Sequence, residues 1–321
     1  MTAPARSGKR RRRGRAEQLM VPDAEFTSYY GRPVIKEPVW EPVDVPSYLF
    51  FGGLAGASSV LAAGSQLSGH RELARVAKVT ALGAISLSAV ALIHDLGRPS
   101  RFVNMLRVFK PSSPMSVGSW LLAGYGPVAG AAAVSEVTGI WPAAGTAATL
   151  GAAVLGPAIA TYTAALICDT AVPSWHEGYR EMPYLFAGSA SGAAGGLGLL
   201  ATRPAEAGPA RRLAVLGASV ELVAKQLLIR RLAATPGLES SKGLAEPYGK
   251  DRAGAVLRAA EVLTVAGLAG AVLGRRRRAV SALAGVSLLA ASALTRYGVF
   301  EAGLASARDP KYTIAPQRRR I

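Results

Sequence analysis

His94 and Asp95 stand next to each other at the end of an apolar stretch, "ALGAISLSAVALIHD", which is otherwise uncharged. An imidazole titrates near neutral pH and a neighbouring carboxylate makes it a stronger base, so this pair could exchange protons with a bound substrate. A structural role is equally compatible with the spacing. In that role Asp95 caps backbone groups, while Arg98 and Arg101 anchor the helix end to lipid headgroups.

Three further ionisable residues lie at or near the ends of apolar runs. Asp169 ends a run that begins near Ala143, and His176 follows it in the segment "CDTAVPSWHEG". A carboxylate beside lipid is costly, so a functional role is favoured for Asp169. Arg296 lies near the end of a later run, where a long side chain more often reaches out to the membrane surface than binds a ligand.

Two pairs of opposite charge lie inside apolar segments. Glu221 and Lys225 are four residues apart, and Arg258 and Glu261 are three apart, so each pair shares one face of a helix. We expect sheltered ion pairs with a structural role. A role in relaying protons across the membrane is the alternative.

The elements that must position these groups are predicted to be membrane-spanning helices. Half of the 321 residues are hydrophobic, and windows of about 20 residues carry almost no charge although the chain has 37 Lys and Arg. The sequence therefore predicts an all-α integral membrane protein with eight transmembrane helices. The predicted spans are 48–68, 73–94, 117–138, 143–169, 183–202, 210–230, 253–274 and 279–300.

These spans predict two four-helix bundles flanked by tails. The segments are a basic, Pro-rich tail at 1–47, a first bundle at 48–169, a loop at 170–182, a second bundle at 183–300 and a tail at 301–321. The first and fifth spans open with the similar segments "YLFFGGLAGAS" and "YLFAGSASGAA", which indicate either an internal repeat or a chance likeness of Gly/Ala-rich helix starts. Glycines spaced four apart in them predict close helix packing.

The distribution of Lys and Arg predicts the orientation in the membrane. Most of these residues fall in the tails and in the loops on the side of the tails, so the positive-inside rule predicts a multi-pass protein of the plasma membrane with both termini in the cytoplasm. The arginines at 275–278 are the exception, because the eight predicted spans place them on the side opposite to the tails. The basic block at 9–13 lacks the adjacent apolar segment of an export signal, and we interpret it as a tail near anionic lipid rather than a nucleic-acid-binding segment.

The counts of cysteine and histidine limit which metal sites are possible. The chain has one cysteine, Cys168, and three histidines. A pair of haems in a membrane cytochrome needs four histidines, and an iron–sulfur cluster needs several cysteines. We therefore expect no haem, no iron–sulfur cluster and no metal site in this chain.

Several segments resemble one family, the NrfD-type or polysulfide-reductase-type integral membrane subunit of complex iron–sulfur molybdoenzymes. They are "SYYGRPVIKEPVW" with "YLFFGGLAGAS", "IHDLGRPSRFVNMLRVFKPSSPMSVGSW", "TYTAALICDTAVPSWHE" and "LTRYGVFEAGLASARDPKY". They keep their order over most of the chain. In particular they look like the actinobacterial branch that accompanies formate-dehydrogenase-like catalytic subunits.

The resemblance implies a function and a set of partners. It implies an eight-helix protein that binds menaquinone or menaquinol, as an exchangeable substrate, near the face where a ferredoxin-like iron–sulfur subunit docks. That subunit would connect the quinone to a molybdenum or tungsten bis-pterin catalytic subunit, so this chain would be a non-autonomous part of an oxidoreductase. The first span has no histidine, where a quinone ligand is expected in some relatives.

Quinone chemistry moves two electrons and two protons, so the resemblance implies residues for proton exchange and for binding. The residues expected to exchange protons are His94, Asp95 and Asp169. The residues expected to line the quinone site are Ser119, Trp120, Trp175, His176, Arg296 and Tyr297.

Two other functions stay open at this point. An ion- or proton-translocating module is supported by the internal repeat and by the charged pairs within the spans, although paired broken helices are missing from the pattern. A passive membrane anchor is the third possibility. It predicts that replacing His94 leaves electron transfer to quinone intact, whereas the quinone hypothesis predicts its loss.

Overall fold

The structure is a computed structural model that describes residues 34–318 except 39, 99, 236, 237, 239–241 and 276. The described residues form helices and loops without any strand, which confirms the all-α prediction. The basic block at 9–13 and the motif residues at 28–33 lie outside the described residues.

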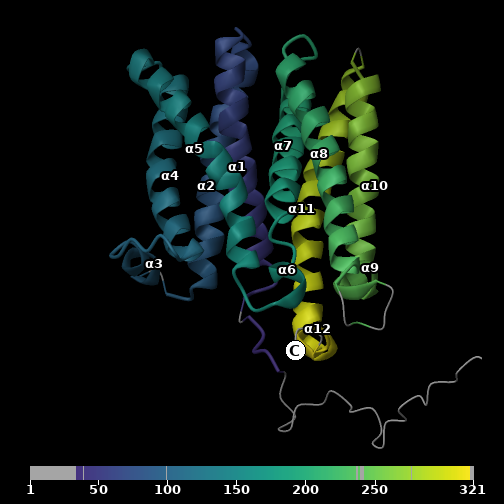
Figure 1. Cartoon of the computed structure of the whole chain (residues 1–321). Coiled ribbons are helices and arrows are strands. Elements are labelled where there is room, and N and C mark those ends of the chain that lie inside the picture. Colours follow the sequence, from purple (N-terminus) through teal and green to yellow (C-terminus); the bar gives the residue numbers. More distant parts are fainter. Residues whose placement is uncertain are drawn as a thin grey trace, which may run out of the picture.

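Eight long helices, counted among the described residues, run side by side (Figure 1). They are α1 (Asp44–Leu67), α2 (Arg71–Asp95), α4 (Pro114–Thr138), α5 (Pro142–Cys168), α7 (Met182–Ala201), α8 (Gly208–Ala233), α10 (Asp251–Leu273) and α11 (Arg278–Arg308). The short helices are α3 (Ser100–Met105), α6 (Pro173–His176), the 3-10 turn η1 (Gly243–Ala245), α9 (Glu246–Gly249) and α12 (Lys311–Arg318).

Within the part of the chain that the structure describes, seven helices are long and apolar enough to cross a membrane. The long helix that differs is α8, which has a comparable length but carries charges along it. These include Arg211 and Arg212 near its start, and Glu221 and Lys225 near its middle. It nevertheless packs against α7 and α10 as a member of the set of long helices that lie side by side (Figure 1).

The contacts divide the long helices into two groups. In the first, α1 and α4 each contact both α2 and α5; in the second, α7 and α10 each contact both α8 and α11. The two groups meet where α1 contacts α7 and α11, and where α5 contacts α7. The two helices with similar opening segments, α1 and α7, therefore lie at the boundary between the groups.

The glycines spaced four apart lie where helix backbones come close. Gly56 of α1 faces Gly156 of α5, and Gly188 of α7 faces Gly217 of α8, in each case so closely that an added methyl group would meet the neighbouring backbone. Because helices in lipid gain stability from close van der Waals contact, glycines at these positions favour packing. The prediction that these glycines are packing positions is confirmed.

The short helices α3, α6, α9 and α12 gather at one end of the helices, together with the C-terminus (Figure 1). We call this the loop-rich end. Here α11 runs past the predicted span end at Phe300 to Arg308, and Arg308 pairs with Glu37 at 2.5 Å. Glu246 of α9 pairs with Lys250 and lies 3.6 Å from Lys311 of α12, so the C-terminal helix is fastened to the loop before α10.

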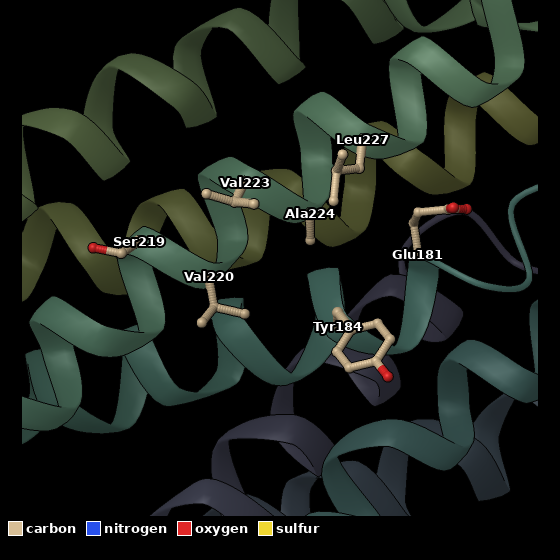
Figure 2. Close-up of a pocket in the computed structure, with 7 residues that line it drawn as sticks. All are labelled: Glu181, Tyr184, Ser219, Val220, Val223, Ala224 and Leu227. Atoms are coloured by element: carbon tan, nitrogen blue, oxygen red, sulfur yellow. The ribbon is translucent and has the colours of Figure 1, made fainter. Parts of the chain in front are cut away.

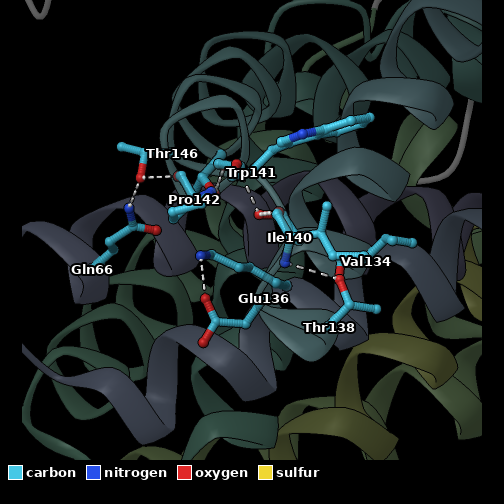
Figure 3. Close-up of polar contacts among 12 residues, drawn as sticks. Gln66, Val134, Glu136, Thr138, Ile140, Trp141, Pro142 and Thr146 are labelled. Atoms are coloured by element: carbon cyan, nitrogen blue, oxygen red, sulfur yellow. Dashed lines mark hydrogen bonds and ion pairs between the residues drawn. The ribbon is translucent and has the colours of Figure 1, made fainter.

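At the opposite end, polar side chains join the helices of the first group (Figure 3). Glu136 of α4 accepts a hydrogen bond of 2.6 Å from Lys78 of α2. Gln66 of α1 donates to the Thr146 hydroxyl of α5 at 3.0 Å. Each contact crosses between two helices, so these polar groups fix neighbouring helices without needing water inside the membrane.

One arginine of the run at 275–278, which is the exception to the predicted orientation, binds the end of a helix. Arg278 donates to the carbonyl oxygens of Leu199 at 2.7 Å and of Thr202 at 2.9 Å, and also to that of Leu200. These carbonyls end α7 and have no partner within the helix. A cation is favoured there because the helix dipole is negative at its C-terminus.

We predict that Arg278→Gln lowers the thermal stability of the purified protein, because the last turn of α7 loses its charged donor. A cost of about 1–3 kcal/mol is expected from the lost hydrogen bonds. Thermal unfolding followed by circular dichroism measures it. The neighbouring Arg277 is exposed, so Arg277→Gln is the matched control. Equal melting temperatures for the two variants would contradict the capping role.

Candidate functional site

A pocket of about 560 Å³ lies at the loop-rich end, where the two helix groups meet. It is bounded by the start of α4, the end of α5, α6 and the start of α7. Its polar lining consists of Ser112, Tyr162, Cys168, Asp169, His176 and Tyr179. We call it the Asp169 pocket. Its volume falls within the range of about 300–1,000 Å³ that is usual for small-molecule sites.

Asp169 and His176 reach this pocket because the chain turns sharply between α5 and α7. Asp169 is the C-cap of α5, and Pro173 begins the short α6, which ends at His176. The Nδ1 atom of His176 lies 3.2 Å from the carbonyl oxygen of Cys168. A carbonyl can only accept, so Nδ1 carries the proton, and Nε2 of the neutral ring is an acceptor.

Tyr162 lines the pocket from α5 and was not identified from the sequence. Its buried hydroxyl hydrogen-bonds to that of Tyr48, on the first helix. Their rings meet edge to face, with centroids 6.3 Å apart. Tyr162, Ala165 and Asp169 are spaced i, i+3 and i+7, so this spacing could have indicated their shared helix face.

Tyr179 lines the pocket from the loop before α7 and also escaped the sequence analysis. Its hydroxyl accepts a hydrogen bond of 2.9 Å from Nε of Arg180, and the guanidinium of Arg231 lies 4.9 Å from its ring centroid. The bond from Arg180 lowers the pKa of the Tyr179 phenol, and Arg231 lowers it further. Both cations stabilise the phenolate, so this phenol releases a proton more readily than an ordinary tyrosine.

His94 and Asp95 lie apart from the lining of the pocket, where they contact the start of α1 and the segment before it. Nδ1 of His94 is 2.6 Å from Oδ2 of Asp44, the first residue of α1, and the His94 side chain is 77% exposed. Asp95 accepts a hydrogen bond of 3.0 Å from the backbone N–H of Glu41. Asp95 thus caps backbone, as the structural alternative proposed, while His94 stands at the surface beside a carboxylate.

Ser119 and Trp120 lie on α4, outside the lining of the pocket. The buried hydroxyl of Ser119 donates to the carbonyl of Met115 within the same helix at 2.8 Å. Trp120 is partly exposed and packs edge to face on Phe109 with ring centroids 6.3 Å apart. Nothing in these contacts joins either residue to Asp169 or His176.

Trp175 is fully buried and holds α6 in place. It stacks on Trp40 with ring centroids 5.8 Å apart, and its Nε1 donates to the carbonyl of Val299 on α11 at 2.8 Å. Gly303 of α11 leaves the space for the indole, since an added methyl group would meet the ring. Trp175 therefore fixes the position of its neighbour His176.

The expectation that Arg296 reaches the membrane surface is wrong. Its side chain is completely buried between α7 and α11, where it donates to the carbonyl of Phe186 at 2.7 Å and lies 3.8 Å from the ring centroid of that residue. Nε and Nη1 of Arg296 have no hydrogen-bond partner among the described residues. Tyr297 faces the other way, with Arg252 over its ring at 5.2 Å.

The charged pairs within the second group connect neighbouring helices rather than residues of one helix. Lys225 of α8 pairs with Glu261 of α10 at 2.8 Å. Glu221 is buried and accepts a hydrogen bond of 2.7 Å from Thr295 of α11. Arg258 donates to the carbonyl of Gly249. The predicted pairings within each helix are therefore wrong, because packing brings partners of other helices closer.

A second pocket, of about 410 Å³, lies between α7 and α8 (Figure 2). Glu181, the N-cap of α7, and Tyr184 of α7 line it at one end, and the remaining lining comes from one side of α8. Those residues of α8 are Ser219, Val220, Val223, Ala224 and Leu227. We call it the α7–α8 groove. Its predominantly apolar lining fits a hydrocarbon chain better than a polar ring.

The chain was also compared with known proteins. The pattern of the family described as "Polysulphide reductase, NrfD" matches residues 35–231, which include the whole Asp169 pocket. The comparison with curated proteins gives no match. The family match covers more than half of the chain and agrees with the apolar helices, so this multi-pass membrane protein belongs to the NrfD (polysulphide reductase) family.

Proposed function

We propose that this chain is the membrane-anchoring, quinone-reacting subunit of a multi-subunit oxidoreductase. Membership of the family implies a membrane subunit of molybdoenzyme complexes linked to quinone. The observation that carries the proposal further is the Asp169 pocket, which combines a carboxylate, an imidazole and phenols at the boundary of the two helix groups. Such a set can both bind and exchange protons with a quinone ring.

In this proposal α8 completes a set of eight spanning helices, arranged as two four-helix bundles in the plasma membrane. Its central charges are compatible with that position because Lys225 is paired with Glu261 and Glu221 is bonded to Thr295. A charge within a membrane is tolerated when it has a partner, and Glu221 is in addition buried inside the bundle. The loop-rich end faces the cytoplasm, as the concentration of Lys and Arg on that side favours.

Menaquinone or menaquinol is the proposed exchangeable substrate of the Asp169 pocket. Oxidation of the quinol releases two electrons and two protons, and reduction of the quinone takes up the same number. His176 offers Nε2 as an acceptor, Asp169 offers its carboxylate, and Tyr179 has a phenol of lowered pKa. These groups lie next to the loop-rich surface, so protons need to travel only a short way.

The electrons pass to or from partner subunits. We propose that a ferredoxin-like iron–sulfur subunit docks at the loop-rich end and connects the quinone to a molybdenum or tungsten bis-pterin subunit, in a formate-dehydrogenase-like or polysulfide-reductase-like complex. Family members typically assemble with iron–sulfur and molybdoenzyme subunits. The short helices and the ion pairs that fasten α12 to α9 form the surface available at this end (Figure 1).

We predict that Tyr162→Phe and His176→Ala each weaken binding of a menaquinone analogue by roughly tenfold, because each removes a polar group from the pocket. Quenching of tryptophan fluorescence by the analogue in detergent solution measures the affinity. Tyr125→Phe is the matched control. It also removes a buried hydroxyl that bonds to α1, in this case to Ala55 and Ser59, but away from the pocket.

Unchanged affinity in both pocket variants, with a folded protein, would contradict this location of the quinone. A similar loss of affinity in Tyr125→Phe would show that the effect comes from general destabilisation of the helices instead. Melting temperatures measured on the same preparations separate these outcomes.

The proposed route for protons starts at His94. Its partner Asp44 lies one helical turn before Tyr48 on α1, and Tyr48 bonds to the pocket residue Tyr162. Residues four apart on a helix share a face, so α1 joins the exposed imidazole to the pocket. His94 would then act in proton exchange without touching the quinone.

We predict that His94→Gln slows quinol oxidation by the assembled complex by roughly tenfold or more, while the affinity for the menaquinone analogue stays the same. Quinol oxidation in isolated membranes measures the rate. His70→Gln is the control, since His70 lies at the opposite end next to Ser68. A normal rate in His94→Gln would remove His94 from the mechanism, as the passive anchor hypothesis expects.

Proton translocation is the second candidate function, and the buried polar cluster of the second group favours it. The cluster consists of Glu221, Thr295 and Arg296, with Ser189 and Ser292 bonded to each other at 2.9 Å. Two nitrogen atoms of Arg296 lack a partner among the described residues, so water can bind there. A carboxylate and water in a spanning bundle are the components of a proton relay.

If the complex translocates protons through this cluster, Glu221→Gln lowers the number of protons moved per electron without lowering quinol turnover. Proteoliposomes containing the complex and a pH-sensitive dye measure that ratio. The control is Glu136→Gln, whose carboxylate is paired with Lys78 in the other helix group. The same ratio in Glu221→Gln and the wild type would exclude this route.

A further inference from the structure

A large pocket at the end opposite to the loop-rich end is lined by three arginines. It has a volume of about 1,200 Å³ and lies between the start of α8, the loop before it and the end of α10. Arg211, Arg212 and Arg275 line it, and none of its described lining residues is a carboxylate. We call it the arginine pocket. Like charges that converge without a counter-charge favour an anion.

The arginines are only partly engaged within the protein. Arg211 donates from Nη1 to the carbonyl of Ala271 at 2.6 Å, which caps the end of α10. Arg212 and Arg275 are exposed. Glu72 of α2 pairs with Arg203, and Glu206 adjoins the lining in the sequence without being part of it. The guanidinium groups thus have donors available, and arginine suits phosphate because two donors can bind it together.

The arginine pocket adjoins the α7–α8 groove. Ser219 lines both of them. From Arg212 the exposed residues Leu216, Val223 and Leu227 follow along one side of α8 at intervals of a helical turn or two. Figure 2 shows Ser219, Val223 and Leu227 in succession along this helix. From Arg212 to Leu227 the helix rises about 22 Å, which exceeds half the hydrocarbon thickness of a bilayer.

We propose that an anionic phospholipid binds along α8, with its phosphate among Arg211, Arg212 and Arg275 and an acyl chain in the α7–α8 groove. The charged end and the apolar groove occur in the order that a lipid of the adjacent leaflet requires. A free phosphate would contact only the arginines, and a lipid with a neutral headgroup would gain affinity only from the α7–α8 groove. This site is separate from the Asp169 pocket and does not depend on the quinone hypothesis.

The test uses the full-length protein, purified and delipidated in mild detergent, with lipid binding measured by native mass spectrometry. Dioleoyl phosphatidylglycerol is compared with dioleoyl phosphatidylcholine, with dioctanoyl phosphatidylglycerol and with inorganic phosphate. We expect the long-chain anionic lipid to bind most tightly. The variant R212Q/R275Q should bind it about 25-fold more weakly, roughly fivefold for each arginine beside an anionic headgroup.

The matched control is R203Q/R277Q, which removes two exposed arginines from the same end of the protein. It should bind the anionic lipid as the wild type does. Arg211 is kept in both variants because it caps α10. If the double variant does not fold, R212Q alone is measured, with R277Q as its control.

Three results would overturn the proposal. Equal affinities for the two dioleoyl lipids would show that the arginines do not select the headgroup. Equal affinities for the long-chain and short-chain phosphatidylglycerols would show that the groove holds no acyl chain. A gain in melting temperature with inorganic phosphate as large as that with the long-chain lipid would indicate a site for small anions instead.

Discussion

The loop-rich end depends on the burial of one side chain, the indole of Trp175. It stacks on Trp40 from the segment before α1 and bonds to Val299 of α11, so a single residue joins parts of the chain that are far apart in the sequence. The space for it exists only because residue 303 is glycine. A large aromatic ring in close contact on both sides loses little freedom and gains much buried area. Since His176 follows directly, the same packing positions the imidazole of the Asp169 pocket.

Partners of polar groups within the bundles come from neighbouring helices, as the membrane requires. A charge or a free carbonyl that faces lipid must find a protein partner, because no water is available there. Lys225 reaches Glu261 on α10, Glu221 reaches Thr295 on α11, and Arg278 binds the end of α7. These contacts explain how α8, the most highly charged long helix, can pack among apolar neighbours. They also mean that a substitution on α8 acts on two other helices at once.

The fold was largely predictable from the sequence, because long apolar windows and glycine spacing are local signals. The site was predictable only in part. Asp169 and His176 were found because each interrupts or follows an apolar run, and they do line one pocket. Tyr162 was missed because an aromatic residue in an apolar helix looks like any core residue until its neighbours are known. The burial of Arg296 also could not be read from its position near a helix end, since only the packing of α7 and α11 decides it.

The two ends of the molecule use basic residues differently, and this bears on the orientation. The positive-inside rule counts arginines as if each were free in a loop, but Arg278 and Arg211 are bound to the carbonyl ends of α7 and α10. An arginine that caps a helix is required wherever that helix ends, on either side of the membrane. Arg278 is therefore weaker evidence against the proposed orientation than an arginine that is free in a loop. Arg212 and Arg275 line the arginine pocket instead, where the proposed phospholipid would bind them.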